Sequence, residues 1–181
     1  KIKAYVETAD QDFFDKWDKR GCWVDDGPFG AYIEFSKYLK PDLKEWFTPE
    51  GSRGGTSHPF NKQMEVGQVS LRLYRITGEK KYKDRAVKIY YTAKSHFQYF
   101  DNHYCWNYKD PLVPADVNLQ RNDTRHWVDV HMWWAQYQAG EVSKIVEAYN
   151  YGIVFDKQDI QRIINTNLNV MWNKDKVNPV F

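Results

Sequence analysis

Apolar residues recur every three or four positions along most of the chain, which is the spacing of one face of an α-helix. The pattern predicts a first helix ending near Gly21, a second stopped by Pro41, and a third ending at Thr77-Gly78, where glycine accepts a left-handed backbone. The three stripes are Val6, Ala9, Phe13 and Trp17; Ala31, Tyr32, Phe35, Tyr38 and Leu39; and Val66, Val69, Leu73 and Ile76.

Four more helical stripes follow. The break before the fourth is so short that the third and fourth helices should form an antiparallel αα-hairpin. Asp123 or Thr124 is expected to cap a fifth helix, which ends at Gly140. The sixth helix is expected to end at Gly152, and Asp156 to cap the seventh helix. The stripes are Tyr82, Ala86, Ile89, Ala93 and Phe97; Trp127, Val130, His131, Trp134 and Gln138; Val142, Ile145, Val146 and Tyr149; and Ile160, Ile163, Ile164, Leu168 and Met171.

The pattern as a whole predicts an all-α protein of antiparallel helical hairpins, with residues 1–181 in a single domain. Short strands at residues 23–25 and 104–108 are local exceptions that the sequence still allows. The long polar loops between helices are the expected location of function.

Aromatic residues make up 17% of the chain, an unusually high share. The rings either build the core or line a groove in which flat ligands stack. A net charge of +2 argues against nucleic acid but still permits an acidic polysaccharide. The sequence holds no apolar run long enough to span a membrane. It shows no signal peptide at residues 1–10, so the chain is either cytoplasmic or a mature or trimmed form, and we expect a secreted or periplasmic protein.

Two cysteines, Cys22 and Cys105, each precede a tryptophan and are followed six residues later by a proline. A disulfide between these two cysteines would form only if their loops meet. The similarity of the two segments indicates either repeated helix–loop–helix units or chance.

The segment Tyr104–His131 holds the richest set of chemical groups. Asp123 either orients His126 or only caps a helix, and His126 is either a neutral base or a packing histidine. The carboxylates considered for glycoside hydrolysis are Asp25, Asp26, Asp110 and Asp123. His126 and His131 are five residues apart, which is not the zinc spacing, so neither a metal nor another cofactor is expected.

A second polar loop, Gly51–Gln63, lacks the spacing of a phosphate-binding loop. His58 and Asn61 are its candidate substrate-binding residues, and Asn61 has helix capping as the alternative role.

The run Pro59–Gln63 followed by Gly67–Tyr82 resembles the hairpins of six-hairpin (α/α)-toroid proteins, which include polysaccharide lyases of the alginate and heparin type and glucuronyl hydrolase-like enzymes. The segments Trp106–Pro111 and Asn122–His126 look like a loop-to-helix element of that group, with Asn122 at a position where an acidic residue is expected. The resemblance covers about residues 59–172 and implies a partial or complete toroid. A complete toroid needs about twelve helices, so this chain would be a half-toroid, a fragment, or a domain completed by another copy in a homo-oligomer.

The first hypothesis is therefore an enzyme that acts on a polysaccharide, including a uronate-containing glycan, by lyase or hydrolase chemistry. Asn107 or Arg125 would neutralise a uronate carboxylate, His126 or Tyr108 would move the proton, and Trp106 and Trp127 would stack on flanking sugars. The second is a glycan-binding protein without catalysis, which Asn122 favours. The third is a helical scaffold for protein partners.

Overall fold

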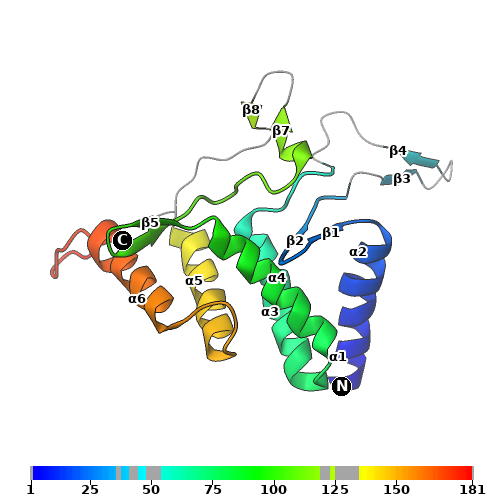
Figure 1. Ribbon diagram of the computed structural model, residues 1–181, viewed down its shortest axis with the longest axis horizontal. Helices are drawn as coiled ribbons and strands as arrows, with labels where there is room; N and C mark the ends of the chain where they lie inside the picture. The colour runs from blue at the N-terminus through cyan, green and yellow to red at the C-terminus, as the bar shows by residue number, and fades with distance from the viewer. Residues whose placement is uncertain are drawn as a thin grey trace. The chain divides into compact units, whose positions relative to one another are not determined.

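The computed structural model describes residues 2–35, 38–40, 45–47, 54–118, 123–124 and 135–180. Within these ranges it contains six α-helices and four two-stranded antiparallel sheets (Figure 1). The expectation of an all-α toroid is therefore wrong, because short β-hairpins interrupt the helices. The helices are α1 (Ile2–Ala9), α2 (Lys16–Lys19), α3 (Phe60–Thr77), α4 (Lys80–Ser95), α5 (Ala135–Asn150) and α6 (Lys157–Asn165). The strands are β1 (Trp23–Asp26), β2 (Phe29–Tyr32), β3 (Tyr38–Lys40), β4 (Glu45–Phe47), β5 (Gln98–Phe100), β6 (His103–Cys105), β7 (Val117–Asn118) and β8 (Asp123–Thr124).

The second expected helix is replaced by strands. Strand β2 pairs with β1 so that Tyr32 lies opposite Trp23, and Gly27 has φ of 57° in the intervening turn. A left-handed backbone at this point suits a tight hairpin, and glycine adopts that conformation without steric cost. A short apolar run such as Ala31–Tyr32 fits a strand as well as a helix, so its period alone misled the prediction. The short strand that the sequence allowed at residues 23–25 is confirmed as β1, and the one allowed at 104–108 overlaps β6.

The expected fifth helix does not open at Asp123 or Thr124, because these residues form β8 opposite β7. The predicted stripe from Trp127 to Trp134 lies outside the described residues. Helix α5 spans Ala135–Asn150 and continues through Gly140 without a break. A single helical glycine costs only about 1 kcal/mol, which the rest of a helix offsets. Gly140 is therefore not a helix end.

The first, third, fourth and seventh predicted helices are confirmed, whereas the sixth is the C-terminal part of α5. The first is α1, a π-helical stretch over Asp10–Asp15, and α2. Helices α3 and α4 form the expected hairpin around Gly78, whose φ is 73°. Asp156 caps α6, which continues into a second π-helical stretch, Thr166–Met171.

The chain divides into two compact units, one of residues 1–58 and 111–127 and the other of residues 59–110 and 128–181. Because compactness alone does not define a domain, the expectation of one domain stays a prediction. None of the described helices is long and apolar enough to cross a membrane. Neither Cys22 nor Cys105 is in a disulfide. Trp23 is the first residue of β1, whereas Trp106 follows the last residue of β6, so the two similar segments do not form matching units.

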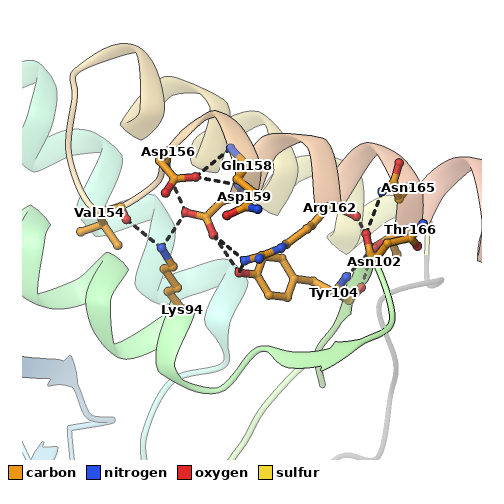
Figure 2. Close-up of polar contacts among 10 residues, drawn as sticks. All are labelled: Lys94, Asn102, Tyr104, Val154, Asp156, Gln158, Asp159, Arg162, Asn165 and Thr166. Atoms are coloured by element: carbon orange, nitrogen blue, oxygen red, sulfur yellow. Dashed lines mark hydrogen bonds and ion pairs between the residues drawn. The ribbon is translucent and has the colours of Figure 1, made fainter.

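In the second unit α3 packs against both α4 and α5, and a polar network joins α4 and β6 to α6 (Figure 2). Asp159 is its centre: Oδ2 accepts from Lys94 Nζ at 2.6 Å, and Oδ1 accepts from the Tyr104 hydroxyl at 2.7 Å. Arg162 donates to the same Tyr104 hydroxyl at 2.7 Å. This network fixes β6, and with it the start of the loop that carries Trp106, Asn107 and Tyr108.

Candidate functional site

Trp106 is a core residue. Its side chain is 2% exposed, its ring stacks on Phe97 at a centroid distance of 4.7 Å, and its Nε1 donates to Glu141 Oε2 at 2.7 Å. The expectation that Trp106 stacks on a sugar does not agree with this burial, because the indole has no face open to a ligand. The ring instead anchors the loop that follows it.

Glu141 is the buried partner of Trp106 on α5. Its side chain is 2% exposed, and its Oε1 has no hydrogen-bond partner among the described residues. Burial disfavours the charged form and raises the pKa of Glu141 to about 7, although the Trp106 hydrogen bond and Lys144 act in the opposite direction. A carboxyl with this pKa gains and loses a proton near neutral pH.

Tyr108 lies against Tyr137 of α5, with ring centroids 4.9 Å apart and planes at 45°. Tyr108 is half-buried and Tyr137 is 38% exposed. The Tyr108 carbonyl accepts from the Phe60 backbone N–H at 3.0 Å, at the start of α3. The pair therefore places partly exposed aromatic surface where the loop meets the first turns of α3 and α5.

Polar side chains accompany this aromatic pair on the same loop. Asn107 Nδ2 donates to Asp110 Oδ1 at 2.8 Å, and His96 Nδ1, at the end of α4, lies 3.3 Å from Asp110 Oδ2. Burial opposes ionisation of Asp110, but the hydrogen bonds from His96 and Asn107 outweigh it and hold the pKa of Asp110 below its ordinary value. The His96 ring also contacts Phe60, with centroids 5.5 Å apart.

We call the five residues of this group the loop face, since three of them come from one loop. It comprises His96, Asn107, Tyr108, Asp110 and Tyr137. Its imidazole, amide, carboxylate and two phenol rings offer hydrogen-bond donors and acceptors next to aromatic surface. All five residues belong to one compact unit.

The remaining predicted site residues are placed as follows. Asn61 is buried in the first turn of α3, where its Oδ1 accepts from the Lys62 backbone N–H at 2.9 Å. His58, in the other unit, is half-buried with its ring 6.1 Å from that of Trp17. Asp123 is described only through its backbone in β8. Arg125, His126 and Trp127 lie outside the described residues, so their predicted roles stay predictions.

Among the hydrolase carboxylates, Asp25 and Asp26 lie in β1, and the Asp25 carboxylate accepts from Trp23 Nε1 at 3.3 Å. Asp110 belongs to the loop face, in the other unit. The described residues contain no group of three or more metal-ligating side chains.

Sequence reasoning did not identify His96, Tyr137 or Glu141 as site residues. His96 lies at the end of the fourth predicted helix, whose stripe runs to Phe97, and a histidine near a helix end was the available signal. Tyr137 and Glu141 are one turn apart on α5, but the false helix end at Gly140 separated them in the prediction.

Comparison with known proteins identifies no relative: no family model, curated protein or solved structure matches the chain.

Proposed function

We propose that this protein binds an oligo- or polysaccharide at the loop face. The observation that carries the proposal is the Tyr108–Tyr137 pair, whose rings are 4.9 Å apart and partly exposed. Tyr108 lies on the same loop as the hydrogen-bonded residues Asn107 and Asp110. A sugar ring has apolar C–H faces and polar edges. Tyrosine rings suit the first, and amide, carboxylate and imidazole groups suit the second.

The burial pattern supports binding at the aromatic pair rather than at Trp106. A ligand platform needs a ring face open to solvent, and Tyr137 is 38% exposed whereas Trp106 is 2% exposed. The Asp110 contacts also fix the polar groups in advance, so less conformational entropy is lost when a ligand binds.

Chemistry on the bound glycan is the finer part of the proposal. Tyr108 carries a phenol that can move a proton, and a histidine held by a carboxylate, as His96 is by Asp110, is a second proton-transfer group. Lyase or hydrolase activity would place one of these groups against the scissile bond. A binding protein would use the same groups only as hydrogen-bond partners.

The test is a titration of the ¹⁵N-labelled protein with alginate, heparin and pectin oligosaccharides, followed by NMR. We expect at least one glycan to shift the amide resonances of residues 106–110 and 137 while those of residues 80–86 on α4 stay in place. Shifts spread evenly over the second unit, or none with any of the three glycans, would overturn the proposal. Ultraviolet absorbance of unsaturated uronates in the same samples detects lyase turnover.

A further inference from the structure

The loop after β6 is attached to α5 at two points in parallel. Trp106 and Tyr108 are two residues apart on the loop, and their partners Glu141 and Tyr137 are one helical turn apart on α5. Two residues of extended chain span about the same distance as one turn of helix. The loop therefore runs along the first turns of α5, and the buried attachment at Glu141 helps to set the position of the exposed one at Tyr137.

Glu141 is the attachment whose strength can change. Its Oε2 accepts the Trp106 indole N–H at 2.7 Å, while its Oε1 has no partner among the described residues. A hydrogen bond to an ionised carboxylate is stronger than one to a neutral acid. Gain of a proton at Glu141 would therefore weaken the contact that holds Trp106.

Charged groups are described on α5 and on the elements packed against it. Lys144, on α5 itself, is the charged residue that acts on its carboxyl, and Lys144 Nζ also donates to the Gly140 carbonyl at 3.2 Å. On α3, Arg72 pairs with Glu147. On the adjoining elements, Asp159 of α6 pairs with Lys94 and Arg162, and His96 pairs with Asp110.

We propose that Glu141 is a positioning residue that makes glycan binding at the loop face depend on pH, through Trp106 and the loop that carries Tyr108. The proposal rests on the proposed function. Ionised Glu141 holds Trp106 firmly and keeps Tyr108 against Tyr137, whereas the protonated acid lets the loop relax. Burial sets the pKa of this carboxyl to about 7, so the change falls in a range in which the protein can be assayed.

The experiment measures the affinity for the tightest-binding of the alginate, heparin and pectin fragments from pH 5.5 to 8.5, for the wild type and Glu141→Gln. We expect the wild type to bind about fivefold more tightly at the alkaline end, the effect of strengthening one hydrogen bond. Glu141→Gln keeps an acceptor of the same shape but cannot ionise, so its affinity should lose that rise. Glu65→Gln, a change on the exposed surface of α3, is the matched control and should keep the wild-type profile.

Two further measurements keep the test decisive. Trp106→Phe removes the indole N–H and should flatten the profile in the same way, which covers the case in which Glu141→Gln fails to fold. The indole N–H resonance of Trp106, recorded without glycan, should move through the same pH range in the wild type alone.

A pH profile in Glu141→Gln identical to that of the wild type would overturn the proposal, because the pH dependence would then not come from Glu141. Wild-type affinity that is constant with pH would also overturn it while leaving the proposed function intact. Absence of binding at every pH would overturn the proposed function and this inference with it.

Discussion

Gly67 of α3 lies directly against the ring of Tyr90 of α4: a Cβ atom at position 67 would be 3.0 Å from Tyr90 Cε2 and 3.3 Å from Ile89 Cγ2. The two helices pack this closely because residue 67 has no side chain. Tyr90 is fully buried, so its ring has little room to move.

We therefore expect Gly67→Ala to lower the free energy of unfolding by about 1–3 kcal/mol, the usual cost of overpacking a core. Gly140→Ala is the matched control. It lies in the interior of α5, where an added Cβ meets only the end of the Lys144 side chain at 3.4 Å, so it should stabilise the protein by up to about 1 kcal/mol. Urea unfolding of both variants measures the two effects, and stabilisation by Gly67→Ala would contradict the packing described.

Glu141 makes a second prediction, on stability. At a pH between 4.5, the ordinary pKa of a glutamate, and about 7, the pKa of Glu141 in the folded protein, the carboxyl holds more protons in the folded than in the unfolded protein. The contribution of this group to stability is therefore fully present below pH 4.5 and declines as pH rises through 7, by up to about 3 kcal/mol in total. In Glu141→Gln that decline should be missing. Urea unfolding at pH 5 and pH 8 would measure it, and an equal loss in both proteins would contradict the prediction.

Asp159 should be essential to the docking of α6. It is 2% exposed and accepts hydrogen bonds from Lys94, Tyr104 and its own helix end. We expect Asp159→Asn to lower the free energy of unfolding by about 2–4 kcal/mol, because the amide nitrogen is a donor and would face other donors. Asp84→Asn removes an exposed pair with Lys80 and should cost less than about 1 kcal/mol.

The cost of Asp159→Asn should also depend on pH. Burial opposes ionisation of Asp159, but the hydrogen bonds from Lys94, the Asp156 backbone N–H and Tyr104 hold its pKa below the ordinary value. Its contribution is thus present above the unfolded-state pKa and is lost as pH falls through the folded-state pKa. The stability difference between wild type and variant, followed by thermal unfolding, should shrink on acidification. A difference that grows in acid would contradict the arrangement.

Tyr137 should contribute directly to glycan affinity. Tyr137→Ala removes the exposed ring of the pair and should weaken binding about tenfold, which corresponds to ~1.4 kcal/mol. Tyr91→Ala is the control, because Tyr91 is 44% exposed on α4 and is not part of the loop face. Isothermal titration calorimetry with the tightest-binding fragment separates the two variants. Equal affinities in Tyr137→Ala and the wild type would remove the aromatic pair from the binding surface.

Helices with a regular apolar stripe and a clear end could be predicted from the sequence. The α3–α4 hairpin has both, because Gly78 takes a left-handed backbone, and α6 has an aspartate that caps its first turn. The segment Phe29–Tyr32 could not be assigned by period, since only pairing with β1 decides that it is a strand. Such pairing depends on residues outside the local pattern.

The candidate site could be predicted only in part. Asn107 and Tyr108 were identified because polar and aromatic side chains gather in that loop. The same reasoning favours ligand binding for Trp106, yet this ring is buried against a glutamate 35 positions away. Composition predicts that a ring prefers a partly apolar site, but it cannot predict whether a ligand or the core supplies that site.

The carboxylate of Asp159 has a place in local as well as tertiary structure. Its Oδ2 accepts a hydrogen bond from the Asp156 backbone N–H at 2.9 Å, which completes a capping box at the start of α6. The same oxygen also accepts a hydrogen bond from Lys94 Nζ of α4. A side chain that its own helix has already oriented has fewer rotamers to give up when α4 arrives. Formation of the first turn of α6 thereby prepares the acceptor for the tertiary contact, which couples the nucleation of one helix to its assembly with another.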